Sequence, residues 1–552
     1  MKNLKYIFAT IALGVTLTSC GDSFLDQDPE NGIILPEQFE KLSDNLEGSI
    51  MGIYSEMYAA SGTIQFGQRA IDMYGDIQSG DMAMKKNSYG WFESYERGFF
   101  YAYAGSYIWS YYYDIIHLTN LCAIAADDDI PEIINAIGSG EEPSNIIAQR
   151  GYYYGQILTM RGWAYAGLLR YFCDPMEFAE SFDAPSVPIY TATEVKAGTL
   201  GERRASIAEV YDRIYEDLAT AIEVLDYYSA YNKRSSKLEV DADVARVILA
   251  YAMLNLGEYG GDATYGGKKP NKLAEDLAAE VINKGKYPLL PKTKLTTTGF
   301  ADVNSENWMW GEDVEPTTTT MLASFFGQVD IHTYSYATAG DTKGIDSKLY
   351  DEIAAKGWDA RVNWFRSGSE KFPYCPDGKF YCPSTKHTTD LTEVDGNWLC
   401  DNVFMRVEVA YLIAAEAAYK NNDQVAAVNY LKKLCDERVL DGKDAEYAAW
   451  LATLSGDALK NAIIYNWRVE MWGEGYALQT LRRLSKTVTL GDNHISRYNK
   501  TININDESVR HSFQCQIPTS ESRYNPNLNK GYTTLQPNNT KTKWNYKTTS
   551  IK

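Results

Sequence analysis

The chain contains little histidine, with five residues among 552, at positions 117, 332, 387, 494 and 511. None of them forms an HxxxH or HxH pair, so a histidine-based zinc centre is not expected. No GxSxG nucleophile elbow is present. The glycine-rich segment 261–268 misses the spacing of a phosphate-binding P-loop. These absences exclude the usual signatures of zinc hydrolases, serine hydrolases and P-loop proteins.

Basic residues are also few relative to acidic ones. The chain has 53 Lys and Arg against 73 Asp and Glu, a net charge of −20. Such a surface repels phosphate backbones, so we expect no nucleic-acid partner. Hydrophobic residues make up 45% and charged residues 23%. This is ordinary globular usage and excludes a mainly disordered chain or a polytopic membrane protein.

The N-terminal segment predicts a lipoprotein signal peptide. Lys2 and Lys5 precede an apolar run over 7–17, which is short for a transmembrane helix. Small residues then lead to Cys20, the pattern of a bacterial lipobox, in which the cysteine is lipidated. We predict a signal peptide over 1–19 and a lipidated, acidic tether over 20–40. Two acyl chains would anchor the protein durably to a membrane.

Seven cysteines follow Cys20, at positions 122, 173, 375, 382, 400, 435 and 515. Their spacing matches no CxxC zinc pattern. In an oxidising compartment the turn at Pro376-Asp377-Gly378 allows a Cys375–Cys382 disulfide, and reduced, partly buried thiols are the alternative. We expect no cofactor and no metal ligand set. No motif indicates a structural Ca²⁺ in a loop, although the sequence does not exclude one.

Helical periodicity dominates the chain. Apolar residues recur at steps of three and four over 157–171, 210–225, 244–254, 273–281, 404–439 and 459–471. Small residues at Gly155, Gly162, Ala166 and Gly167 predict close approach between helices. Irregular stretches separate the pairs, notably 61–106, 285–403 and 485–552. We predict a mostly α fold, with tetratricopeptide-like helix pairs as the scaffold and large irregular loop insertions.

Five segments, in order, carry a resemblance to a known family. After the lipobox and Phe24-Leu25-Asp26 they are 156–172 (QILTMRGWAYAGLLRYF), 407–417 (VEVAYLIAAEA), 468–476 (RVEMWGEGY) with 481–484 (LRRL), and 516–521 (QIPTSE) with 525–528 (NPNL). Together they resemble the SusD/RagB family of outer-membrane nutrient-binding lipoproteins. Cys173 stands where this family usually has glycine, and Tyr476 where it usually has histidine.

The resemblance implies a surface-exposed, lipid-anchored, non-catalytic protein of the outer membrane. It implies capture of an oligosaccharide or polysaccharide and a role as lid for a SusC-like TonB-dependent barrel transporter. Peptide capture, as in RagB-like relatives, is the alternative. It also implies an N-terminal helical region over 41–284 and a C-terminal region over 285–552 with ligand-facing loops. The family's ligand-contact residues lie in variable loops, so no site transfers by motif.

Aromatic residues are the candidates for sugar stacking. Tyrosine is abundant, with 42 residues against 18 Phe and 12 Trp, and its hydroxyl suits partly exposed surfaces. We select rings in loops, with polar neighbours to bond sugar hydroxyls: Trp91, Tyr95, Asp81, Tyr334, Tyr336 and His332. Trp308 and Trp310 are interpreted as packing residues of a strand, and the cluster at 107–113 as helix packing.

Paired carboxylates at Glu470 and Glu474 are the one pattern that suggests a hydrolase. They lie four residues apart on one helix face, as glycosidase acids can. Flanking arginines at 468, 482 and 483 favour a structural charge network instead. A lipoprotein hydrolase and a purely structural scaffold without a small ligand remain the further alternatives.

Overall fold

The computed structural model describes residues 45–92, 95–96, 104–173, 184–257, 263–297, 299–315, 322–381, 400–495, 500–504, 506 and 513–530. The predicted signal peptide, Cys20 and the tether lie outside these residues, as does Cys382. Within the described residues no helix is both long and apolar enough to cross a bilayer.

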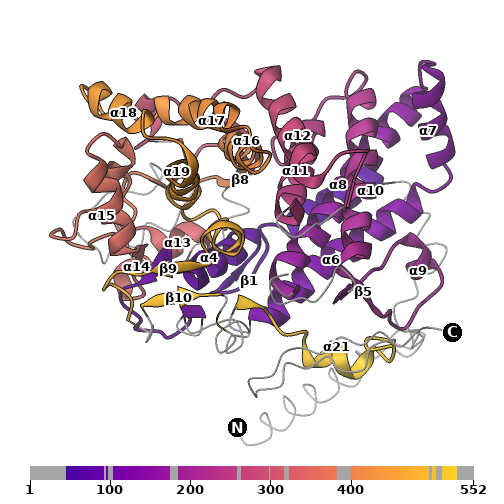
Figure 1. Ribbon diagram of the computed structural model, residues 1–552. Coiled ribbons are helices and arrows are strands. Elements are labelled where there is room, and N and C mark those ends of the chain that lie inside the picture. Colours follow the sequence, from indigo (N-terminus) through magenta and orange to yellow (C-terminus); the bar gives the residue numbers. More distant parts are fainter. Residues whose placement is uncertain are drawn as a thin grey trace, which may run out of the picture.

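Long helices form the scaffold of the molecule and run across its whole width (Figure 1). Their bounds are α3 Leu46–Ser55, α6 Ala104–Ala125, α7 Ile130–Ser139, α8 Asn145–Phe172, α10 Ile207–Tyr228, α11 Ala242–Gly257, α12 Pro270–Lys284, α16 Glu408–Lys420, α17 Gln424–Asp436, α18 Asp444–Leu451 and α19 Gly456–Glu470. Neighbours pack in sequence: α6 on α8, α8 on α10, α10 on α11, α11 on α12, α12 on α16 and α16 on α17. The predicted mostly α, tetratricopeptide-like fold is confirmed.

The small residues of α8 allow the close packing that the sequence predicts. A Cβ added to Gly155 would lie 2.6 Å from Leu225, and one added to Gly162 would lie 2.7 Å from Leu218, both on α10. A Cβ on Gly167 would meet the ring of Tyr112 on α6 at 2.3 Å. Since real side chains do not approach so closely, the glycines set the spacing of α6, α8 and α10.

Shorter elements complete the fold. The helices are α4 Gln68–Ser79, α9 Ala192–Lys196, α13 Phe325–Val329, α14 Tyr336–Ala339, α15 Ser347–Lys356, α20 Ala477–Thr480 and α21 Thr519–Tyr524, with 3₁₀ turns η3 Lys292–Lys294 and η4 Ala360–Trp364 and the π-helical turn η5 Leu481–Ser485. The strands are β1 Ala60–Gly62, β2 Gln65–Phe66, β3 Met82–Met84, β4 Pro185–Pro188, β5 Arg204–Ser206, β6 Trp308–Glu312, β7 Lys343–Ile345, β8 Asn402–Arg406, β9 Thr487–Thr489 and β10 Thr501–Asn503.

The strands form five two-stranded antiparallel sheets in the described part of the chain. In the pair β6–β8, Trp308 and Trp310 are buried, with 0% and 1% of their surface exposed, as the packing interpretation expects. The pair β3–β7 matters most for the site, because it joins the segment after Met84 to the segment before Lys343.

Helix α4 corrects the prediction of an irregular stretch over 61–106. All twelve residues of α4 are buried, including Arg69, Asp72 and Asp76. Arg69 donates to Asp72 at 3.0 Å, and Asp76 accepts the backbone N–H of Gly473 at 2.7 Å. Apolar residues recur at Ala70, Tyr74 and Ile77, but this pattern is short and is interrupted by polar residues whose burial depends on partners elsewhere in the chain.

Candidate functional site

Three aromatic rings form a partly exposed cluster on the loops beside the β3–β7 pair. Tyr89 stacks on Trp91, with ring centroids 4.5 Å apart and planes 11° from parallel. Tyr336 meets Trp91 at 90° and 4.9 Å, and meets Tyr89 at 79° and 6.0 Å. Tyr89 is 43% exposed, while Trp91 and Tyr336 are half-buried. The structure therefore brings together Trp91 and Tyr336, two residues that the sequence analysis selected independently.

Backbone pairing holds the two loops of this cluster together. Lys85 N–H donates to the carbonyl of Thr342 at 2.9 Å, and Ser88 N–H donates to that of Gly340 at 2.8 Å. Helix α14 starts at Tyr336 with a capping box between Ser335 and Thr338. Gly340 ends it at φ 118°, and a Cβ there would lie 2.3 Å from Ser88 Oγ. The ring positions are therefore fixed by local structure.

The segment before α14 alternates between buried and accessible residues. Ile331, Thr333 and Ser335 are buried, whereas His332, Tyr334 and Tyr336 are half-buried. These last three side chains, which we call the aromatic strip, are therefore accessible from one side, whereas their neighbours in the chain are buried. We therefore keep Tyr334 as a candidate because of its partial exposure, not because of a contact.

His332 contacts Asp377 rather than the ring cluster. Its Nε2 lies 2.7 Å from Asp377 Oδ1, and its ring centroid lies 6.0 Å from that of Tyr381. Arg366 Nε donates to the other oxygen of Asp377 at 3.1 Å. The His332 hydrogen bond and Arg366 hold the pKa of Asp377 below its usual value. The two contacts hold the ionised Asp377 carboxylate in a fixed position beside His332, the first residue of the aromatic strip.

The loop that carries Asp377 is conformationally strained. Phe372, Tyr374 and Phe380 have positive φ values of 55°, 66° and 61°, which non-glycine residues rarely adopt. Each costs on the order of 1 kcal/mol or more. The Phe372 ring packs against the small buried group of Ile331, Ala337 and Cys375, so the strained loop lies against the segment that leads to Tyr336. Such strain is typical of functional loops.

Two other selected residues lie in the interior. Tyr95 is 2% exposed and stacks on Tyr74, with centroids 4.3 Å apart. Asp81 is 2% exposed and accepts from Arg468 Nε at 2.9 Å. Neither side chain is available to a ligand, so we withdraw both from the site. The sequence places them beside a polar loop, but their burial depends on packing against the preceding helix α4 and against α19, which lies far along the chain.

The structure decides between the two alternatives given for Cys375, a disulfide to Cys382 or a reduced thiol. Cys375 is a free, fully buried thiol, so it does not bridge to Cys382. Cys400 is disulfide-bonded, and its partner lies outside the described residues. Cys122, Cys435 and Cys515 are also reduced thiols. Burial raises the pKa of Cys435 to about 12, which keeps it protonated and unreactive.

The Glu470 and Glu474 pair belongs to a buried charge network, as predicted, but its partners differ from the expected ones. Arg406 donates to Glu470 at 2.7 Å and to Glu474 at 2.9 Å. Arg438 donates to Glu470 at 2.8 Å, and Lys379 to Glu474 at 2.8 Å. Burial alone would raise the pKa of Glu470, but the guanidinium groups hold it well below its usual value. Neither carboxylate is free for acid–base chemistry.

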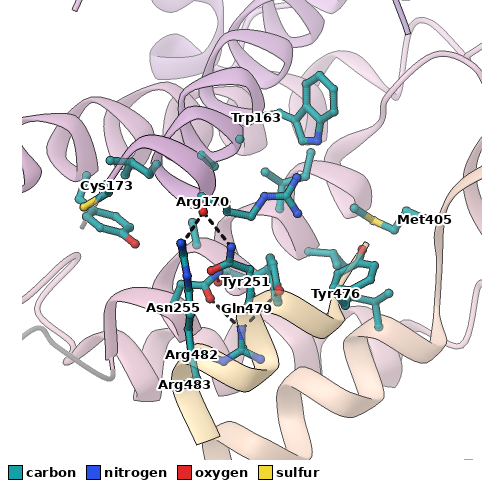
Figure 2. A pocket seen from close by; sticks show the side chains of 18 of the residues that line it. Trp163, Arg170, Cys173, Tyr251, Asn255, Met405, Tyr476, Gln479, Arg482 and Arg483 are labelled. Atoms are coloured by element: carbon teal, nitrogen blue, oxygen red, sulfur yellow. Dashed lines mark hydrogen bonds between the residues drawn. The ribbon is translucent and has the colours of Figure 1, made fainter. Parts of the chain in front are cut away.

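A cavity of about 90 Å³ lies between α8, α11 and the α20–η5 turn (Figure 2). Its polar groups hold the helices together: Gln479 Nε2 donates to the carbonyl of Arg170 at 2.9 Å, and Arg483 donates to Asn255 Oδ1 at 2.7 Å. Arg483 also binds Glu416 through two nitrogens. Because these polar groups already bond one another across the helices, we place the candidate site at the aromatic cluster.

Two family models match the chain in tandem. The one described as "Starch-binding associating with outer membrane" matches residues 23–249, and the one described as "SusD family" matches residues 247–534. The chain belongs to the SusD family. A comparison with curated proteins finds no match.

Solved SusD-type structures share the fold. A SusD-like carbohydrate binding protein from Bacteroides vulgatus aligns with a TM-score of 0.66 at 21% identity, covering 89% of this chain and 98% of its own. A SusD superfamily protein from Bacteroides thetaiotaomicron gives 0.64 at 18%, covering 88% and 98%. A putative sugar binding protein from Bacteroides vulgatus gives 0.62 at 21%, covering 90% and 98%. At these identities the likeness concerns the fold.

Sequence reasoning missed Tyr89 within this SusD-family chain. It lies at the end of a stretch interpreted as a polar loop, and its stacking on Trp91 depends on a turn at Gly90, whose φ is 74°. The pattern Tyr-Gly-Trp was the available signal, because a left-handed glycine between two aromatic residues allows their rings to meet.

Proposed function

We propose that this protein binds an oligosaccharide at the Tyr89–Trp91–Tyr336 cluster. The observation that carries the proposal is the right-angle contact of two partly exposed rings, Trp91 and Tyr336, held by paired loops. A pyranose has an apolar face and a polar rim. An aromatic ring covers the face, and nearby side chains such as His332 and Asp377 can bond the hydroxyls.

The expected affinity is modest. Stacking one sugar face buries on the order of 50–100 Å², worth about 1–2.5 kcal/mol at roughly 25 cal/mol per Å². Two or three rings, less the cost of ordering the ligand, give a Kd of about 10 µM to 1 mM. Such weak binding suits a protein that must release its ligand.

The biological setting follows the family. One matching family model describes outer-membrane association and starch binding, and two similar structures are described as carbohydrate or sugar binding. We infer that the chain is anchored through Cys20 at the cell surface, is non-catalytic, and acts as lid for a SusC-like TonB-dependent transporter. Mass spectrometry of the N-terminus and co-purification of a barrel with the tagged full chain test these points. An unlipidated N-terminus contradicts the anchor, and purification without a barrel contradicts the lid role.

Calorimetry tests the ligand class. The full-length protein in detergent is titrated with neutral oligosaccharides, acidic oligosaccharides and peptides, and each mixture is checked for cleavage products. Saturable heat with a glycan and no cleavage is the expected result. Heat with peptides alone contradicts the glycan proposal in favour of peptide capture, and glycan cleavage contradicts the non-catalytic role.

A further inference from the structure

Three lysines without described ion pairs lie on the loop that carries Tyr89 and Trp91 or on the neighbouring strained loop: Lys85, Lys86 and Lys371. Within the part of the chain that the structure describes, no carboxylate lies within ion-pair distance of any of them. Elsewhere lysines commonly have such partners, as in Lys196–Asp127 and Lys268–Asp276, both at 2.6 Å. In a chain with a net charge of −20, lysines that lie close together without such partners give a local excess of positive charge.

Lys85 and Lys86 lie close to the loops that carry the aromatic rings. Lys86 is exposed, and its Cε lies 3.9 Å from the point where a Cβ on Gly340 would lie, at the end of the helix that begins with Tyr336. Lys85 Nζ lies 5.8 Å from the ring centre of Tyr374, on the strained loop. An ammonium on an aromatic face keeps its charge available to a ligand.

The third lysine extends the same charge along the strained loop. Lys371 is exposed, and its Nζ lies 5.2 Å from the ring centre of Phe372. That ring packs on the buried group beneath the strip that leads to Tyr336. The three ammonium groups are therefore carried by the two loops that frame the aromatic strip.

Two acidic residues of the strained loop bear on this charge. Asp377 is shared by His332 and Arg366. Glu370 accepts the backbone N–H of Ser367 at 2.6 Å, a neutral donor, so its carboxylate charge stays beside Lys371 and offsets it in part. Lys85 and Lys86 have no described carboxylate partner, so the loop that carries Tyr89 and Trp91 has a local excess of positive charge, although the protein as a whole repels anions.

We propose that the oligosaccharide bound at this cluster is anionic, with carboxylate or sulfate groups on its sugar units. The inference rests on the proposed function and adds the substrate class. One sugar unit stacks on Trp91 and Tyr336, and the anionic group of a neighbouring unit lies against Lys85, Lys86 or Lys371. Long-range attraction to these lysines raises the association rate and offsets repulsion by the acidic surface.

The test compares matched ligands on the full-length protein. Oligogalacturonate is titrated against its carboxyl-reduced, neutral counterpart of equal length, and a sulfated oligosaccharide against its desulfated form. We expect at least one acidic member to bind about tenfold more tightly than its neutral partner, because exposed ion pairs contribute modestly and several act together. Raising NaCl from 50 to 500 mM should remove most of that preference. The pair that shows the preference identifies carboxylate or sulfate as the recognised group.

Lysine variants locate the effect. The Lys85→Gln, Lys86→Gln double variant should lose the acidic preference while keeping its affinity for the neutral ligand. Lys433→Gln is the matched control, since Lys433 is exposed on α17 without a described ion pair. Equal binding of acidic and neutral ligands, or a preference unchanged by salt and by the double variant, overturns this inference and leaves glycan binding intact. Absence of binding to every glycan overturns the proposed function itself.

Discussion

Trp91 and Tyr336 meet at a right angle, with ring centroids 4.9 Å apart, although 245 positions separate them in the sequence. The β3–β7 pair brings them together, and Tyr89 stacks on the indole. A corner of this kind can cover the face of one sugar and the edge of the next. The relationship leads directly to a prediction about binding.

Replacement of Trp91 by alanine should weaken glycan binding about 5- to 50-fold, because one stacked face contributes about 1–2.5 kcal/mol. Tyr336→Ala should act in the same direction. Calorimetry measures the affinity, and circular dichroism verifies folding. Tyr524→Ala is the control, since Tyr524 is 80% exposed on α21 and has no part in the cluster. Unchanged affinity in both ring variants would contradict the site assignment.

Replacement of Glu470 by glutamine should destabilise the protein by about 3 kcal/mol, because it leaves Arg406, Arg438 and Arg361 buried with too little negative charge. Urea unfolding of the variant measures this loss. Glu446→Gln removes an exposed partner of Lys443 and should leave the midpoint unchanged. If Glu470→Gln retained full stability and altered the cleavage of any glycan, the structural role would be wrong.

His494 lies between two carboxylates, with Nδ1 3.0 Å from Glu96 and Nε2 3.0 Å from Asp346. The Asp346 carboxylate also accepts backbone N–H groups of Gly491 and Leu349. Burial opposes ionisation, but the His494 hydrogen bond and these donors hold the pKa of Asp346 below its ordinary value of 3.8. Folding therefore favours the ionised form, and this stabilisation is present above pH 3.8 and is lost as pH falls through the folded-state pKa.

His494→Gln should accordingly cost about 3 kcal/mol at pH 6, and the difference from wild type should shrink as the pH falls below 3.8. Urea unfolding over this pH range measures both values. A gap that stays constant down to pH 3 would show that the histidine contributes through packing rather than through charge.

Gly162→Val should destabilise the α8–α10 contact by about 1–3 kcal/mol, since even a Cβ would lie 2.7 Å from Leu218. Gly138→Ala on α7 is the matched control. It has open space around it, and alanine there should raise stability slightly through helix propensity. Thermal unfolding compares the two variants. Equal effects would show that α8 can move away from α10 without cost.

The scaffold could be predicted from sequence because its information is local. Apolar steps of three and four mark α8, α10, α11 and α19, and the glycines of α8 mark the close contacts. Helix α4 was missed because its apolar pattern is short and is interrupted by polar residues, whose burial depends on partners elsewhere, as that of Asp76 depends on the turn at Gly473.

The site was predicted only in part for the same physical reason. Trp91 and Tyr336 were identifiable as rings in polar loops, but the exposure of a ring is decided by packing between distant segments. Tyr95 looks similar in sequence and is covered by Tyr74. Asp81 resembles a hydroxyl-binding residue in sequence, but its carboxylate is paired with Arg468. Tyr89 was passed over because its stacking partner could not be seen without the turn at Gly90.

The most direct test of the account is a calorimetric titration of the full-length protein and its Trp91→Ala variant with one panel of neutral and acidic oligosaccharides and peptides. The account predicts saturable glycan binding by the wild type and a 5- to 50-fold loss in the variant. Peptide binding without glycan binding, or glycan binding that the variant retains in full, would contradict it.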